Sequence, residues 1–265
     1  MVLRVAGEAQ GGLPMGRHRR TGWVATLALT ACTWAGHAVH AATLVVITPH
    51  PDDAEASCGG LIANSTAAGD RVVILSLTGG ELGIPGKSPA EARAIREAES
   101  RRGAAVLGAS VEFFGAIDGS LAVDSATAVR LGEQLSRIGP DVVLAPWPLD
   151  VHADHQAAGM LAWRVFLERA RSFDLWFYET SMPPHTTSFR FQPDAWIDIS
   201  QAMATKQRAT LEHASQHPAE WFETYRALAR FRGLEADVPL AEGYVHARPS
   251  GAMGGRDARA VTRLP

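Results

Sequence analysis

The sequence predicts an α/β fold in which a mostly parallel, twisted, Rossmann-like sheet carries helices on both faces. Short runs of aliphatic and β-branched residues alternate along the chain with longer stretches of helical character, and polar clusters directly follow two of the runs. Strands that alternate with helices of this length imply right-handed crossovers and parallel pairing. Of the 265 residues, 46% are hydrophobic, which is enough for a sizeable core and excludes a wholly disordered chain.

The individual elements follow from local signals. Apolar runs such as Leu44–Ile47 are typical of strands buried on both faces. Gly69 and Gly108 stand where helices end, and Asp124 stands where one begins. In chain order we expect strand 44–47, helix 53–68, strand 72–77, helix 89–107, strand 111–114, a helix capped by Asp124 and running to 138, strand 142–144, helix 155–171, strand 175–178, one or two strands within 189–199 and helix 202–215.

Charge and cysteine content exclude several functional classes. A formal net charge of −3 gives no reason to expect nucleic-acid binding. The two cysteines, Cys32 and Cys58, supply neither a disulfide framework nor a cysteine-rich zinc module. Any metal must therefore be held mainly by histidine and carboxylate, and the ten histidines leave room for that. No pattern in the sequence indicates an oligomeric state.

Residues 1–42 are predicted to be a leader. A basic stretch at Arg17–Arg20 precedes an uncharged stretch at 21–36 and then small residues, which is typical of a secretory signal. The apolar part is shorter than the ~20 residues that span a bilayer. Cys32 ends a Leu-Thr-Ala-Cys sequence that resembles a bacterial lipoprotein box, so a lipid on Cys32 is the one membrane tether we expect. The protein is thus predicted to be exported, as a periplasmic, secreted or lipid-anchored form; the alternative is a disordered leader.

One domain, residues 43–247, is expected to follow the leader. The remaining residues, 248–265, are rich in glycine and arginine and are predicted to be a disordered tail.

Two polar clusters follow predicted strands. His50-Pro-Asp-Asp53 comes after the first strand, and His152-Ala-Asp-His155 follows the strand at 142–144. Open α/β sheets bind ligands at the carboxyl ends of their strands, so both clusters are expected in one crevice. His50, Asp53 and His155 would form a zinc shell with one position left for water. Zinc lowers the pKa of that water and polarises a carbonyl oxygen, which is the chemistry of amide or ester hydrolysis.

The neighbouring polar residues suit supporting roles. Asp52 could accept the proton of the attacking water, and His152 could stabilise the oxyanion or protonate the leaving amine. Asp154 could orient one of the histidines or tune the base. The alternatives are a helix N-cap for the aspartate pair and a surface position for the histidines. Finding both clusters at strand ends favours the metal site.

Several motifs together resemble the PIG-L/LmbE-like deacetylase family. The resemblance covers roughly 43–216. It rests on His50-Pro-Asp-Asp53 with Cys58-Gly-Gly60, Thr78-Gly-Gly-Glu81, Arg96-x-x-Glu99, Ala104-x-x-Leu107-Gly108, Asp118-Gly119, His152-Ala-Asp-His155, Asp198-Ile199, Lys206 and Ser215-Gln216.

This resemblance implies an LmbE-like deacetylase fold, with zinc on the three ligands named above, Asp52 as general base and His152 as the electrophilic or acid histidine. It also implies that Arg96 and Asp118 contact sugar hydroxyls; an ion pair on a helix surface and a turn residue before Gly119 are the alternatives. Two departures stand out. Asp150 occupies a position where some thiol-pathway members have tyrosine, and Ala54 one where glutamate is common.

We therefore expect a zinc-dependent N-deacetylase for an N-acetylated sugar of the N-acetylglucosamine type, or a related acetamido compound. One Zn²⁺ per chain is expected, and Fe²⁺ or Co²⁺ would fit the same shell. The alternatives are an amidase or esterase with the same centre, and a non-catalytic metal- and sugar-binding protein. Trp147, Trp176 and Tyr178 lie near strand ends and could stack on sugar rings, although core packing is favoured for Trp176 and Tyr178.

Overall fold

The computed structural model describes residues 41–169, 171–181 and 188–247. The tail expected at 248–265, and all but two residues of the leader, lie outside this range, so both stay predictions. None of the helices among the described residues is long and apolar enough to cross a membrane.

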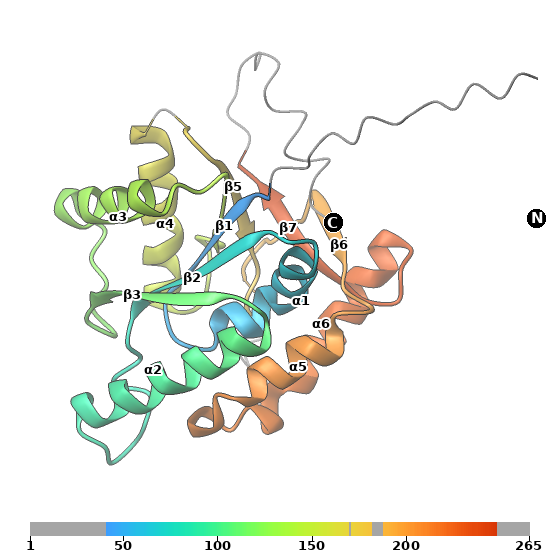
Figure 1. The fold of residues 1–265 in the computed structure, drawn as a ribbon, viewed down its shortest axis with the longest axis horizontal. Helices are drawn as coiled ribbons and strands as arrows, with labels where there is room; N and C mark the ends of the chain where they lie inside the picture. The colour runs from blue at the N-terminus through green and yellow to red at the C-terminus, as the bar shows by residue number, and fades with distance from the viewer. Residues whose placement is uncertain (1–40, 170, 182–187, 248–265) are drawn as a thin grey trace, which may run out of the picture. The chain divides into compact units, whose positions relative to one another are not determined.

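Strands and helices alternate through most of the described chain (Figure 1). The elements are β1 (Thr43–Thr48), α1 (Asp53–Ala67), β2 (Arg71–Thr78), α2 (Pro89–Val106), β3 (Ser110–Ala116), α3 (Ser125–Ile138), β4 (Val142–Pro146), α4 (Ala153–Glu168), β5 (Asp174–Tyr178), β6 (Ala195–Asp198), α5 (Met203–Leu211), a 3₁₀ turn η1 (Ala214–Gln216), α6 (Pro218–Ala236) and β7 (Ala241–His246).

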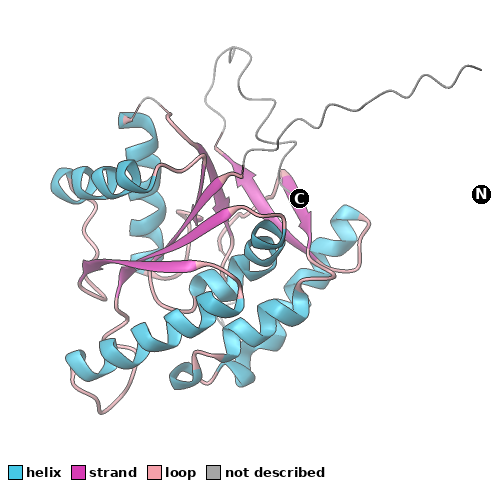
Figure 2. Ribbon diagram, viewed as in Figure 1, coloured by secondary structure: helices cyan, strands magenta, loops and turns pink. Residues whose placement is uncertain are grey.

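In the described part of the chain these strands form one seven-stranded sheet, in the order β3-β2-β1-β4-β5-β7-β6 (Figure 2). The five strands from β3 to β5 in this order pair in parallel, and β7 runs antiparallel to both of its neighbours. The predicted fold class is confirmed. The strand order reverses between β1 and β4, which is the switch point where such sheets bind ligands.

Helices cover both faces of the sheet. Side chains alternate along β1, so Val45 and Ile47 pack with α3 and α4, whereas Leu44 and Val46 pack with α1, α2, α5 and α6. All four side chains are buried. Each such side chain contributes about 1.5–3 kcal/mol on burial, which explains the continuous apolar run of this strand.

Asp124 and Gly108 stand at helix ends, as predicted. Asp124 accepts a hydrogen bond of 2.7 Å from the Thr127 N–H, and Ser88, which was not predicted, forms a capping box with Glu91 at the start of α2. Gly108 has φ +73°, as expected for a residue that follows a helix.

Beyond β5 the prediction is only partly right. Ala195–Asp198 is a strand, in agreement with the one or two strands expected within 189–199, but the helix expected at 202–215 ends at Leu211 before the separate turn η1. Helix α6 and strand β7 were missed. Glu242 and Gly243, poor strand formers, occupy the middle of β7. Glu242 is satisfied there by the Gly60 and Leu61 N–H groups at 2.8 and 2.9 Å and by the Lys206 ammonium at 2.6 Å, so tertiary contacts override local preference.

Candidate active site

A cavity of about 490 Å³ opens at the switch point between β1 and β4. Its floor is formed by the two predicted motifs, because β1 leads directly into His50–Asp53 and β4 leads into His152–His155. All the predicted site residues except Asp154 line this cavity, and Asp154 lies directly behind it. The residues on the motif side are His50, Asp52, Asp53, Arg96, Asp118, His152 and His155.

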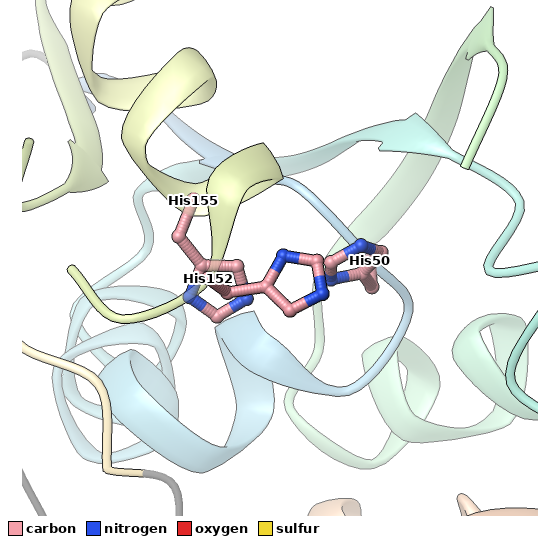
Figure 3. A group of neighbouring side chains, drawn as sticks. All are labelled: His50, His152 and His155. Carbon is pink, nitrogen blue, oxygen red and sulfur yellow. The ribbon is translucent and has the colours of Figure 1, made fainter. Parts of the chain in front are cut away.

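Asp53 lies between the two predicted histidine ligands. Its Oδ2 is 3.3 Å from His50 Nδ1 and 3.3 Å from His155 Nε2. Burial opposes ionisation of Asp53, but the two histidines outweigh it and hold its pKa well below the usual value. Figure 3 shows the rings of His50, His152 and His155 gathered between the start of α4 and the segment after β1.

Carboxylates stand behind His50. Its Nε2 is 3.2 Å from Asp154 Oδ2 and 3.2 Å from Asp118 Oδ1. Asp154 also accepts hydrogen bonds from the Gly119 and Leu121 N–H groups, which fix it in place. Burial lowers the pKa of His50, yet these carboxylates outweigh it and raise the pKa well above the usual value. Asp154 therefore orients the first histidine of the site.

His155 has a carboxylate partner that sequence reasoning did not assign. Asp150 Oδ1 is 3.2 Å from His155 Nδ1, and Asp150 itself accepts hydrogen bonds from Thr180 and Ser188. Burial opposes protonation of His155, but Asp53 and Asp150 raise its pKa to about 9. In the sequence, Asp150 stands out only as a departure from the family pattern. Its place in the loop after β4, two residues before His152, was the available signal.

Asp52 takes a strained backbone conformation to face the cavity. It has φ +109°, which costs on the order of 1–3 kcal/mol for a non-glycine residue. It stands at the N-cap of α1, but its side chain makes no cap hydrogen bond. Arg96 holds it instead, with Nη2 2.6 Å from Pro51 O and 3.1 Å from Asp52 Oδ2. Burial raises the pKa of Asp52 to about 6, against the opposing effect of Arg96.

The Thr78-Gly-Gly-Glu81 motif makes room for that arginine. Arg96 is buried, with 4% of its surface exposed, and it does not form the surface ion pair considered as an alternative. A Cβ on Gly80 or on Gly83 would lie 2.3 Å from Arg96 Nη1, and Gly80 has φ +63°. Only glycine allows this approach of the guanidinium to the loop.

His152 caps helix α4 through its ring. Its Nδ1 accepts a hydrogen bond of 3.1 Å from the Asp154 N–H, so the neutral ring carries its proton on Nε2. Burial and the neighbouring His50 and His155 lower the pKa of His152. A neutral His152 can therefore still donate one hydrogen bond from Nε2.

The donors fit a divalent metal. Two histidines and one carboxylate form a typical zinc donor set. Four carboxylates lie 3.2–3.3 Å from nitrogens of His50 and His155, and this concentration of negative charge favours a cation. A second set is also close together: nitrogens of His50, His152 and His155 lie within 4.8 Å of one another. Both sets share the two histidines that carboxylates orient.

The far side of the cavity is a C-terminal wall formed by Gln216, Trp221 and Tyr225. The Trp221 indole N–H donates to Gln216 O at 2.8 Å, and Gln216 Nε2 donates to Gly83 O at 3.2 Å. Tyr225 Oη accepts a hydrogen bond of 3.1 Å from the Ser181 N–H. Two of these residues lie on α6, the helix that sequence reasoning missed.

A buried glutamate anchors this wall. Glu99 of α2 accepts hydrogen bonds from the Ser215 N–H at 2.8 Å and from the Ser215 hydroxyl at 2.6 Å. Ser215-Gln216 and Glu99, which the resemblance marked without a role, thus hold η1 against α2.

None of the aromatic residues that sequence reasoning considered for sugar stacking lines the cavity. Trp176 and Tyr178 are 1% exposed and belong to the core, as the favoured reading predicts. Trp147 packs edge-on against Phe177 and Phe191, outside the residues that line the cavity.

Comparisons with known proteins agree with the motifs. A family model described as GlcNAc-PI de-N-acetylase (PIG-L) matches residues 45–166. The diacetylchitobiose deacetylase of Thermococcus kodakarensis is 31% identical over 218 residues, which cover 76% of this chain and 81% of that protein. The 4-oxalmesaconate hydratase of Pseudomonas putida is 27% identical over 208 residues, covering 72% of this chain and 80% of the hydratase.

A solved structure extends the likeness to three dimensions. The N,N'-diacetylchitobiose deacetylase from Pyrococcus horikoshii, in complex with an inhibitor, superposes with a TM-score of 0.68 at 26% identity, covering 78% of this chain and 84% of that one. The resemblance carried by the motifs is therefore confirmed, and the chain belongs to the PIG-L, or LmbE-like deacetylase, family of N-deacetylase hydrolases.

Proposed function

We propose that the protein removes the acetyl group from an N-acetylated sugar of the N-acetylglucosamine type. The observation that carries this proposal is the Asp53 carboxylate held 3.3 Å from a nitrogen of each of two buried histidines, in a cavity that Asp52 also lines. His50, Asp53 and His155 would hold one Zn²⁺, and Fe²⁺ or Co²⁺ suit the same donors. When bound, such a metal activates water and polarises the acetamide carbonyl.

Asp52 is the proposed general base. With a pKa of about 6 it is mostly ionised at neutral pH, yet it is basic enough to accept a proton from water. Arg96 fixes the carboxylate by contacting both its Oδ2 and the preceding carbonyl. The strained backbone of Asp52 turns this group away from the helix it would otherwise cap and toward the cavity.

His152 is the proposed partner of the carbonyl oxygen. Because its Nδ1 accepts a hydrogen bond from the backbone, Nε2–H is the group available to stabilise the negative charge that develops as water adds. As the C–N bond breaks, the proton that Asp52 accepted from the water passes to the amine nitrogen, and acetate and a free amine remain. A neutral imidazole can perform the first task, in agreement with the lowered pKa of His152.

The cavity suits a sugar better than a multiply charged acid. Its volume lies within the range of about 300–1,000 Å³ that is usual for small-molecule sites. Arg96 is the one arginine among the lining residues, which include no lysine, and Asp52 already pairs with it. Beyond the proposed metal, the lining residues therefore offer no unpaired lysine or arginine to a second negative group of a substrate, and the relatives named diacetylchitobiose deacetylases favour a sugar.

The test is an acetate-release screen across N-acetylated sugars with the metal-loaded protein, beside the Asp52→Asn variant. We expect acetate and a free amine in equal amounts from an N-acetylglucosamine-type sugar, and release that is at least ~10²-fold slower from the variant. Release of a different acyl group would favour the amidase or esterase alternative. Saturable sugar binding without acetate release would favour the non-catalytic alternative.

We also propose that the protein is exported and that the leader is removed or lipidated. Expressed in a bacterial host, the mature chain should begin at Cys32 or Ala42, as determined by N-terminal sequencing or intact mass. A full-length cytoplasmic product would contradict the proposal.

A further inference from the structure

Helix α1 begins with the sequence of a capping box, but the box is not formed. Asp52 is the N-cap residue and Glu55 the third residue of the helix; at this spacing each side chain can bond to the backbone N–H of the other residue. In α2 the same spacing, Ser88 and Glu91, makes both bonds. In α1 the Asp52 side chain makes no cap bond, and neither oxygen of Glu55 has a hydrogen-bond partner among the described residues.

Glu55 contacts a histidine from the C-terminal part of the chain instead. His213 lies between α5 and η1, and its Nε2 is 3.3 Å from Glu55 Oε1. Both side chains are fully buried. Burial opposes a charge on His213, but Glu55 outweighs it and raises the pKa of His213, so the two groups form an ion pair. A pair buried this deeply holds both partners, because a charge left alone in the interior is strongly unfavourable.

Gly103 of α2 leaves the space that this pair occupies. A Cβ on Gly103 would lie 2.9 Å from Glu55 Oε1 and 3.0 Å from His213 Nε2. Helix α5 packs against both α1 and α2, so the pair lies where three helices meet. The contact between Glu55 and His213 therefore depends on a residue without a side chain.

The two members of the unused box thus have separate partners. Asp52 faces the cavity at φ +109°, with its Oδ2 3.1 Å from Arg96 Nη2, while Glu55 is held by His213. An N-cap residue ordinarily has an extended backbone, so formation of the box would relieve the strain at Asp52. It would also turn the Asp52 carboxylate onto the helix and away from the cavity. The helix would gain a cap, and the site would lose its proposed base.

We propose that His213 is a positioning residue for Asp52: by holding Glu55, it prevents the capping box and keeps the Asp52 carboxylate in the cavity. The inference rests on the proposed function, in which Asp52 is the general base. His213 is not among the residues that line the cavity, so it acts on the reaction through Glu55 and Asp52.

The first test is His213→Leu, which removes the partner of Glu55. With the sugar found in the acetate-release screen, kcat should fall about 10- to 100-fold, because the base moves away from the reacting atoms. KM and the metal content should change little. A crystal structure of the variant should show the Asp52 carboxylate on the Glu55 N–H. His213→Gln should keep most of the parental kcat, since its amide can still donate to Glu55.

A double variant separates this role from two others. In Glu55→Leu/His213→Leu no capping box can form and no buried charge is left unpaired, so kcat should return to within a few-fold of the parental value. If the charge of His213 acted directly on Asp52, or if the pair only supported the fold, the double variant would be at least as slow as His213→Leu. Either result would overturn the inference.

Matched variants nearby test the same contact. Gly103→Ala should lower kcat in the same direction, because its Cβ would crowd the pair. Arg102→Ala is the control. Arg102 Nε lies 3.0 Å from Glu212 Oε2 in an exposed ion pair that joins α2 to the end of α5. Its loss should leave kcat unchanged.

Parental kcat in His213→Leu, or a crystal structure of this variant in which Asp52 still contacts Arg96, would overturn the inference. If His213→Leu does not fold, Gly103→Ala decides in its place, and an unchanged kcat there would count against the positioning role. If the wild type releases no acetate from any sugar, the proposed function fails, and the crystal structure of His213→Leu alone decides whether His213 holds Asp52 in the cavity.

Discussion

The floor of the cavity and its C-terminal wall are built in different ways. The floor residues come from two contiguous motifs, His50–Asp53 and His152–His155, each between a parallel strand and the first turn of the helix that follows it. The wall residues Gln216, Trp221 and Tyr225 come from η1 and α6, and hydrogen bonds to Gly83 and Ser181 hold them in place. Groups that react together must lie at fixed positions relative to one another, and short motifs at strand ends provide this. The wall only has to present a surface, so residues without a recognisable motif can form it through tertiary packing.

The largest effect is expected at the floor, where Asp53→Ala and His155→Ala should abolish metal binding. Each variant removes one donor from the proposed set of His50, Asp53 and His155. In this set Asp53 Oδ2 lies 3.3 Å from a nitrogen of each histidine. Metal content of the purified variants is the measurement. His152→Ala is the matched control and should keep its metal. Loss of metal from His152→Ala but not from Asp53→Ala would instead assign the ion to the three-histidine set.

A second prediction separates chemistry from metal binding within the floor. Asp52→Asn keeps the shape of the side chain but removes the proton acceptor, so turnover should fall by ~10²- to 10⁴-fold while the metal remains. In the parent enzyme, activity should rise with pH through the ionisation of Asp52 and of the metal-activated water, which titrate as a coupled pair. Near-parental turnover in Asp52→Asn would assign the base to another group.

The wall should respond differently, with a change in substrate binding and none in metal content. Ser215→Ala removes a hydrogen bond of 2.6 Å to Glu99, which is 4% exposed and would lose a partner. Leaving a buried group without a hydrogen-bond partner typically costs about 1–3 kcal/mol of free energy. Part of this cost should appear as a several-fold rise in KM. Ser136→Ala, which removes an exposed hydrogen bond from Arg169, is the control. Loss of metal from Ser215→Ala would show that floor and wall are not independent.

The smallest effect is expected far from both regions, at the cap of α3. The Thr127 N–H lowers the pKa of Asp124, so the carboxylate stabilises the folded state above its usual pKa, and this contribution is lost as the pH falls through the folded value. Asp124→Ala should therefore lower Tm slightly at neutral pH, and the difference should disappear in acid. Asp124→Asn is the control, because asparagine can still cap the helix but has no carboxyl group to titrate. Kinetic constants that change with Asp124→Ala would contradict the separation of this helix from the site.

The sequence predicted the floor well because its signals are local. His50, Asp52, Asp53, His152 and His155 all line one cavity, as expected from clusters at strand ends. The elements from β1 to β5 also follow from local patterns, since these strands contain short apolar runs and α2, α3 and α4 have a side chain that caps their first turn.

What could not be predicted depends on contacts between distant segments. From the sequence alone Glu242 would be placed on the surface, but Lys206 and backbone N–H groups in the middle of α1 satisfy it inside the sheet. Asp150 reads as a loop residue until Thr180 and Ser188, some 30 or more positions away, fix it behind His155. Trp221 belongs to no recognisable motif. It lines the cavity because its indole contacts Gln216, which in turn contacts Gly83.

The place of β7 in the sheet also bears on the order in which the chain can assemble. The edge strand β6 pairs with β7 alone among the described strands, and β7 is the last of them to be synthesised. A chain growing on the ribosome can therefore pair its five parallel strands early, while β6 must wait for Ala241–His246 before it has a partner. Helix α6 packs on β7 as well, so it also lacks one of its supports until then. A truncation before Ala241 would therefore keep the motifs of the floor and the residues of the wall, but it would leave β6 without its partner strand and α6 without β7 to pack on.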